Sequence, residues 1–138
     1  MIDSTSKLIR RHEGLRLTPY EDSRGILTIG FGRNLERGIS EEEATQLFER
    51  DLREARVAAR QYKWFKRLSR PRQAVVVDMH FQLGARGFSG FVKTIAALAD
   101  QDFETAADEM LRSRWHEQTP ARAERLSIMM RLDEWPTD

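Results

Sequence analysis

The chain has 138 residues, of which 40% are apolar and 33% are charged, and it contains no cysteine. This length and composition fit one globular domain, and they exclude a fibrous or disordered chain and a fold held by disulfides. The formal net charge of +1 excludes a general polyanion binder, so no nucleic-acid partner is expected. Locally, residues 53–72 carry eight basic side chains and one acid, Glu54. This segment fits either a solvated helix face or attraction to an anionic cell wall.

The first expected element is a short helix, capped within the Ser-Thr-Ser run at residues 4–6. Because Gly14 is a helix-stop signal, Glu13 is expected at the end of this helix. Residues 16–32 combine β-favouring side chains with proline and glycine, which predicts short strands. The sequence Asp-Ser-Arg-Gly at residues 22–25 predicts the turn of a β-hairpin.

A long helix is expected from residue 41 to about residue 62. Ser40 and Glu43 have the spacing of a capping box, and apolar residues follow at helical intervals. The helix is apolar on one side and charged on the other, which suits a connector between a small β-containing lobe and a helical lobe.

The later part of the chain is predicted to be helical. A nearly continuous apolar run at residues 74–83 predicts a buried central helix, which Gly84 would cap. Three further helices are expected, at residues 91–99, 103–111 and 120–132. Thr119 is the expected N-cap of the last one, with Pro120 at its first helical position.

Together these elements predict one α+β domain over residues 1–138 that is mostly α-helical and has two lobes. The small N-terminal β-hairpin lobe covers about residues 14–40, and the connecting helix covers residues 41–62. The helical lobe covers about residues 63–138 together with the N-terminal helix.

Neither a secretory signal nor a membrane span is evident. The start of the chain lacks basic residues followed by an apolar run, and no later stretch is long and apolar enough for a span. We therefore expect a protein made in the cytoplasm without a signal peptide and without stable membrane binding. A target outside the cytoplasm would then require a separate release step.

Glu13 and Asp22 are the first candidates for catalysis. Hydrolysis of a glycosidic bond needs one carboxylic acid to protonate the leaving oxygen and a second carboxylate to direct water or to attack. A helix end and a hairpin turn, separated by a short strand, can place two carboxyls across one cleft. The spacing alone is a weak signal, since the chain has 22 acidic residues and most such residues are merely solvated.

Other chemistries find little support. His12, His80 and His116 lack the spacing of metal ligands, so no metal site is expected, and His80 is interpreted as a core residue. The Gly-x-Ser-x-Gly motif of serine hydrolases and a phosphate-binding loop are both missing. No cofactor is therefore expected.

Several motifs follow one another along the chain. They are EGLRLTPYED at residues 13–22, TIGFG at residues 28–32, FQLG at residues 81–84, GF at residues 90–91 and SRWHEQTPARAER at residues 113–125. Together these motifs resemble the T-even phage lysozymes, or endolysins, which form glycoside hydrolase family 24. The resemblance covers almost the whole chain in order.

The resemblance implies roles for four residues. Glu13 would be the general acid, Asp22 the carboxylate that positions water, and Thr28 the hydroxyl that holds this water. Arg122 would pair with the catalytic acid. The expected outcome is inversion, for which the two carboxyls should lie about 6.5 to 9.5 Å apart.

The resemblance also implies substrate contacts at Asn34, Phe81, Thr94 and Glu109. Asn34, Thr94 and Glu109 differ in type from the family residues expected there, so altered or lost contacts are compatible with the sequence. Phe81 fits a core position equally well. Gln82, next to Phe81, is a further candidate, either for packing or for binding the glycan through its amide.

The resemblance implies a monomeric lysozyme that needs no cofactor. Its substrate would be the glycan strands of bacterial peptidoglycan, cut at the β-1,4 bond between N-acetylmuramic acid and N-acetylglucosamine. Its role would be lysis at the end of a phage cycle, after release through a holin. Two alternatives stay open: a lysozyme-fold glycan-binding module with little or no turnover, and a lytic transglycosylase that uses Glu13 and leaves anhydro ends.

Overall fold

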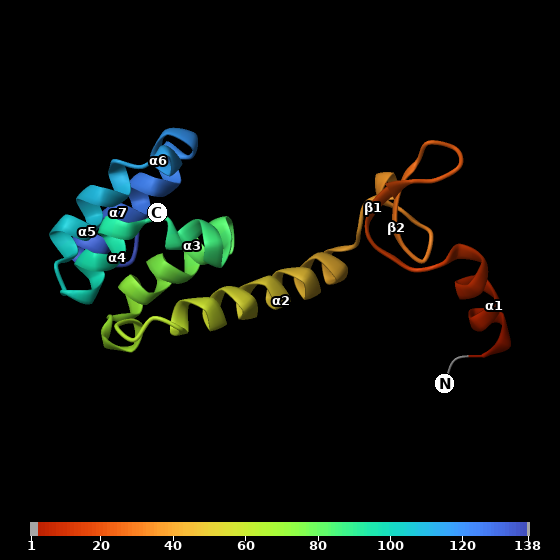
Figure 1. The fold of residues 1–138 in the computed structure, drawn as a ribbon, viewed down its shortest axis with the longest axis horizontal. Coiled ribbons are helices and arrows are strands. Elements are labelled where there is room, and N and C mark those ends of the chain that lie inside the picture. The colour runs from red at the N-terminus through yellow and green to blue at the C-terminus, as the bar shows by residue number, and fades with distance from the viewer. Residues whose placement is uncertain (1–2, 138) are drawn as a thin grey trace. The chain divides into compact units, whose positions relative to one another are not determined.

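The computed structural model describes residues 3–137 and contains seven α-helices, two short 3₁₀-helices and one three-stranded sheet (Figure 1). This mostly helical α+β structure confirms the predicted fold class. The chain divides into two compact units, of which the first ends at Leu47 and the second begins at Phe48. The assignment of the N-terminal helix to the helical lobe stays a prediction. Of the helices between residues 3 and 137, none is both long and apolar enough to cross a membrane.

Helix α1 (Ser4–Glu13) begins one residue earlier than the predicted cap. Asp3 is the N-cap, because its Oδ1 accepts a hydrogen bond from the backbone N–H of Ser6 at 2.7 Å. The expected cap within residues 4–6 was therefore wrong. The predicted end at Glu13 is confirmed: Gly14 has a φ of 71°, and its N–H donates to the carbonyl of Arg10.

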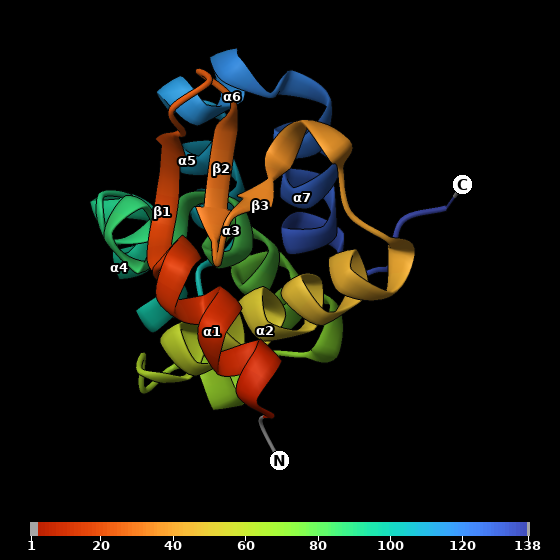
Figure 2. The same cartoon turned by 90° about the vertical axis from the view of Figure 1, so that its right-hand side faces the viewer.

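The sheet of the first unit is antiparallel, in the order β1-β2-β3 (Figure 2). Its strands are β1 (Arg16–Glu21), β2 (Leu27–Gly30) and β3 (Arg33–Asn34). Thr28 lies between Tyr20 on β1 and Asn34 on β3, so the three form one row across the sheet. The predicted hairpin turn is confirmed, since the N–H of Asp22 donates to the carbonyl of Ile26 at 2.9 Å.

A short 3₁₀-helix, η1 (Leu35–Arg37), leads into helix α2 (Glu41–Arg60). The predicted capping box is present: the N–H of Ser40 donates to Glu43 Oε1 at 3.0 Å, and the N–H of Glu43 donates to Ser40 Oγ at 3.1 Å. Helix α2 ends at Arg60, two residues before the predicted end.

The second unit contains the apolar core. Its remaining helices are η2 (Phe65–Arg67), α3 (Arg70–Ser89), α4 (Val92–Ala99), α5 (Phe103–Leu111), α6 (Arg114–Gln118) and α7 (Pro120–Leu132). Met79 on α3, Met110 on α5 and Met130 on α7 are among the fully buried side chains of this core, and α5 packs beside α7 (Figure 1). In residues 3–47, by contrast, Thr28 is the one buried side chain.

Three details of the second unit differ from expectation. Gly84 does not cap α3 but kinks it, with φ 76° and ψ 169°, and the helix resumes and runs to Ser89. Helix α6 was not predicted. Thr119 precedes α7 as expected, but its hydroxyl donates to the carbonyl of Trp115 at 3.1 Å and makes no N-cap bond.

Candidate functional site

Asp22 fixes the turn between β1 and β2 with its own carboxylate. Its Oδ1 accepts hydrogen bonds from the backbone N–H of Arg24 at 2.8 Å and from that of Ile26 at 2.9 Å. The hydrogen bond from Ile26 is the main reason why the pKa of Asp22 lies below its ordinary value, and Arg24 lowers the pKa further. Asp22 is therefore an oriented anion at neutral pH.

Thr28 lies on β2, on the same face of the sheet as Asp22. Asp22 pairs with Ile26, and Ile26 is two residues before Thr28, so strand alternation points Asp22 and Thr28 to one side. Thr28 is only 2% exposed, and its hydroxyl donates to the carbonyl of Ile26 at 2.8 Å. Because this bond uses the hydroxyl proton, the oxygen of Thr28 is left to accept a hydrogen bond from water.

Glu13, the last residue of α1, extends its carboxyl to the turn between β2 and β3. Gly32 in this turn has a φ of 74°, and a Cβ placed on it would overlap the carboxyl of Glu13. Gly32 is thus required for its backbone conformation and also for the space that the carboxyl occupies. In the first unit, the carboxyl of Glu13 thus lies at the turn after β2, whereas Asp22 is held just before the start of β2 and Thr28 lies on the strand. The catalytic roles of the three residues stay predictions.

Asn34 ends β3 beside Thr28, and its side chain has a local structural role. Its Oδ1 accepts a hydrogen bond from the N–H of Glu36 at 2.8 Å and caps η1. The side-chain NH₂ is not used in this cap. The predicted substrate contact of Asn34 stays a prediction.

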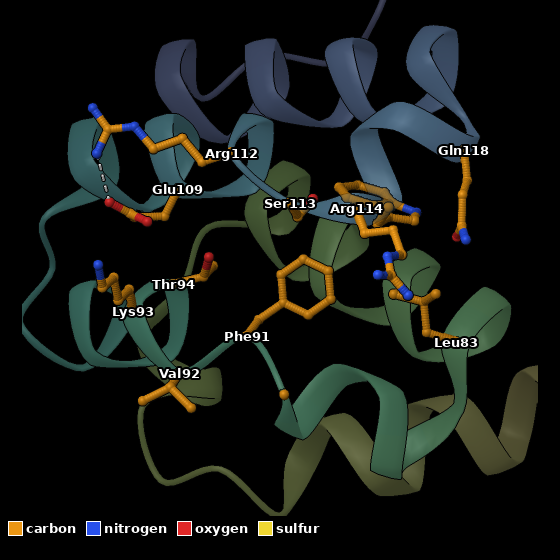
Figure 3. A pocket seen from close by; sticks show the side chains of 12 residues that line it. Leu83, Phe91, Val92, Lys93, Thr94, Glu109, Arg112, Ser113, Arg114 and Gln118 are labelled. Atoms are coloured by element: carbon orange, nitrogen blue, oxygen red, sulfur yellow. Dashed lines mark hydrogen bonds and ion pairs between the residues drawn. The ribbon is translucent and has the colours of Figure 1, made fainter.

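Thr94 and Glu109 line the same hollow of the second unit, which has a volume of 560 Å³ (Figure 3). Figure 3 shows Thr94 on α4 facing Glu109 on α5 and Arg112, the residue that follows α5, with the ring of Phe91 beside them. Thr94 is 2% exposed, and Glu109 accepts a hydrogen bond from Arg112 at 3.0 Å. The structure therefore brings these two predicted contact residues together, in a hollow with polar walls and an aromatic side.

Phe81 lines a different hollow of the second unit, with a volume of 880 Å³. It is 38% exposed, and its ring centroid lies 5.6 Å from that of Phe48. Arg122 lines the same hollow and donates to Oδ1 of Asp78 from Nε at 2.8 Å and from Nη2 at 2.7 Å. Phe81 is thus separate from the hollow of Thr94 and Glu109. The pairing of Arg122 with Glu13 stays a prediction.

Gln82 makes a packing contact between α3 and α6. Its Oε1 accepts a hydrogen bond from Nε1 of Trp115 at 2.8 Å, and Trp115 is buried. This bond gives Gln82 one of the two roles that the sequence left open. A contact of Gln82 with glycan stays a prediction.

His80 is the core residue that the sequence predicted. It is 3% exposed, its Nδ1 lies 2.8 Å from the carbonyl of Val76, and its ring stacks on Phe88 with centroids 4.2 Å apart. Burial lowers the pKa of His80. Among residues 3–137, no group of three or more His, Asp or Glu side chains is arranged to hold a metal ion.

The sequence interpretation missed two residues of these sites. Gly32 leaves the space that the carboxyl of Glu13 occupies. The sequence signal for Gly32 was the Gly-x-Gly motif at residues 30–32. Asp78 bonds to Arg122, and its only signal was a charged residue inside an apolar run. The partners Asp78 and Arg122 are 44 residues apart, so spacing gave no indication of their contact.

Comparison with known proteins gives consistent matches. The phage lysozyme family matches residues 10–131. The pre-baseplate central spike protein Gp5 of Enterobacteria phage T4 is 30% identical over 92% of this chain, and the match spans 27% of the spike protein. Two probable T4-type lysozymes of Dictyostelium discoideum are 27% and 25% identical, over 91% of this chain and 92% of each relative.

Proposed function

Since the chain belongs to the phage lysozyme family, we propose that it degrades bacterial peptidoglycan by hydrolysing the β-1,4 bond between N-acetylmuramic acid and N-acetylglucosamine. One observation carries the proposal. The carboxyl of Asp22 is held just before the start of β2, the carboxyl of Glu13 lies at the turn after its end, and Thr28 lies on the strand between these two points.

In this mechanism Glu13 protonates the leaving oxygen of the glycosidic bond, and Asp22 takes a proton from the attacking water. The lowered pKa of Asp22 supports this division of roles, because a general base must be ionised before the reaction. Thr28 accepts a hydrogen bond from the same water and orients it. Each of these three residues of the first unit then has one role in the reaction.

Inversion is the stereochemical outcome that this division of roles predicts, because a carboxylate that activates water, and does not attack the sugar itself, needs room for that water. Inverting enzymes place their two carboxyls about 6.5 to 9.5 Å apart, whereas retaining enzymes place them about 5 to 5.5 Å apart.

The remaining parts of the proposal concern binding and location. Asn34, Phe81, Gln82, Thr94 and Glu109 would contact the glycan strand. The enzyme would act as a monomer and without a cofactor. It would be made in the host cytoplasm and reach the wall through a holin.

The decisive experiment digests purified peptidoglycan with the wild type, Glu13→Gln and Asp22→Asn. Because Asn keeps an oxygen that can accept the hydrogen bonds from Arg24 and Ile26, Asp22→Asn should remove the charge and leave the turn intact. Glu21→Gln, at an exposed carboxyl next to Asp22, is the matched control. We expect reducing ends from the wild type and the control, and a loss of about 100-fold or more in both site variants.

The products distinguish the competing functions. Anhydro ends would indicate a lytic transglycosylase, and binding without any new ends would indicate a glycan-binding module. Proton NMR of the first product gives the stereochemistry, for which we expect an inverted anomeric centre. A retained centre would contradict the assignment of Asp22 as a general base.

A further inference from the structure

Tyr20 stands beside the two residues that hold the attacking water in the proposed mechanism. It pairs with Thr28 across β1 and β2, and Asp22 lies opposite Ile26 two residues further along. Opposite pairs that are two residues apart project their side chains to the same face of a sheet. The four residues therefore form a square on this face. Asp22 and Thr28 lie on one diagonal of the square, and the other diagonal joins Tyr20 to Ile26.

This face of the sheet is more enclosed than the opposite face. Thr28 is buried and Tyr20 and Asp22 are half-buried, whereas Glu21 and Leu27, which project to the opposite face, are exposed. The elements that pack most closely against β2 are β1, β3 and η1, and all of them belong to the first unit. The square is thus built from strands of the first unit.

The diagonal between Asp22 and Thr28 has room for a water molecule. Residues on such a diagonal of an antiparallel pair lie about 7–8 Å apart, so their short polar side chains do not meet directly. A water between them contacts the carboxylate of Asp22 on one side and the hydroxyl of Thr28 on the other. Its two remaining sides along the sheet face Tyr20 and Ile26.

Arg16 holds the ring of Tyr20 at the edge of this space. Its guanidinium carbon lies 4.8 Å from the centroid of the ring, which is a cation–π contact. The contact uses the ring and not the hydroxyl, so phenylalanine can replace Tyr20 in it. The side chain that borders the space is therefore a large, flat group whose position is fixed within β1.

We propose, on the basis of the proposed function, that Tyr20 is a positioning residue for the attacking water. Its ring closes one side of the space between Asp22 and Thr28, so that a single water fits there and larger nucleophiles are kept out. The role is in the reaction step and not in glycan binding. A displacement of a reacting group by about 1 Å can cost about 100-fold in rate, so the loss of this wall should be measurable.

The first test measures kcat and KM on soluble glycan fragments of peptidoglycan. Tyr20→Val removes the ring but keeps a residue that favours strands, and Tyr20→Phe keeps the ring. Leu27→Ala is the matched control, because it shortens an apolar side chain on the opposite face next to Thr28. We expect Tyr20→Val to lower kcat by about 30-fold with KM within about twofold, and Tyr20→Phe and Leu27→Ala to keep about half of kcat or more.

The second test offers methanol as an alternative nucleophile. In methanolysis the methanol oxygen bonds to the anomeric carbon, its proton passes to Asp22, and Glu13 protonates the leaving oxygen as the glycosidic bond breaks. Truncation of Tyr20 leaves space that admits methanol, so the ratio of methyl glycoside to reducing ends should rise about fivefold or more in Tyr20→Val. The ratio should stay at the wild-type value in Tyr20→Phe and Leu27→Ala. A variant that has only lost stability releases less of both products in an unchanged ratio.

Several outcomes would overturn the role of the ring. They are a wild-type kcat in Tyr20→Val, equal losses in Tyr20→Val and Tyr20→Phe, and an unchanged product ratio in Tyr20→Val. If urea unfolding shows that Tyr20→Val is not folded under the assay conditions, Tyr20→Leu replaces it in both tests. The wild type and Asp22→Asn are measured in the same assays. No hydrolysis by the wild type, or full activity of Asp22→Asn, would overturn the proposed function and the role of Tyr20 with it, whereas the outcomes above leave the proposed function intact.

Discussion

A single methyl group at position 32 would collide with the side chain that we propose as the catalytic acid. Gly32→Ala should therefore displace the carboxyl of Glu13 and strain a backbone with a φ of 74°. We expect a loss of activity of at least about tenfold and a fall in the free energy of unfolding of about 1–3 kcal/mol. Urea unfolding and release of reducing ends measure the two effects.

Gly30→Ala is the matched control in the same turn. Gly30 has a φ of 70°, but a Cβ added there meets open space. This variant should lose about 1 kcal/mol of stability through backbone strain and keep most of its activity. Equal losses of activity in the two variants would contradict a specific contact between Gly32 and Glu13.

Residues with a local role were predictable from the sequence, and residues with distant partners were not. Glu13 and Asp22 stand at a helix end and a turn that the sequence itself marks with Gly14 and Gly25. The contact of Gln82 with Trp115, 33 residues away in the chain, needs the folded chain to be seen. Motif matching identifies which residues are near the chemistry, but it does not show which other groups hold them.

Helix bounds were predictable where periodicity and end signals agree. Helices α5 and α7 have the predicted bounds, because apolar spacing and the proline at the start of α7 indicate the same limits. Helix α3 continues beyond its predicted stop, since Gly84 bends the chain and the apolar residue Phe88 on its far side is still buried in the core. Helix α6 has only five residues, too few to show a helical period.

His116 links three helices of the second unit, and its charge should affect their stability. Its Nδ1 lies 2.9 Å from the carbonyl of Leu111 at the end of α5, and its Nε2 lies 3.1 Å from Glu124 Oε1 on α7. The hydrogen bond with Glu124 is the main reason why the pKa of His116 is raised above 6.5. The protonated ring can donate to both acceptors, so it is the stabilising form.

The sign of the pH dependence follows from this raised pKa. The contribution of His116 is fully present below pH 6.5 and is lost as the pH rises through the pKa of the folded state. The difference in free energy of unfolding between the wild type and His116→Gln should therefore shrink above pH 6.5, and Glu124→Gln should reduce this dependence. Urea unfolding over a pH series tests it, and parallel curves for the wild type and His116→Gln would contradict it.

At the scale of the whole molecule, apolar burial is unevenly distributed between the two units. The apolar core cluster runs from Ala59 to Met130 and lies entirely in the second unit. Within residues 3–47, Thr28 is the one buried side chain, and the structure there depends on caps and turn hydrogen bonds such as those of Asp3 and Asp22. Because burial supplies most of the stability of a domain, the first unit should open more readily than the second.

Hydrogen exchange with mass spectrometry tests this difference directly. We expect amides in α5 and α7 to exchange with a free energy close to that of global unfolding, and amides in α1 and β1 to exchange with a value at least about 2 kcal/mol lower. Met110→Ala should narrow the gap, because Met110 is fully buried and its truncation should lower the protection of α5 and α7 by about 2–5 kcal/mol. Protection in α1 and β1 should stay unchanged until global unfolding becomes the easier route. Equal protection of all four elements in the wild type, falling in step in Met110→Ala, would show instead that the two units unfold as one.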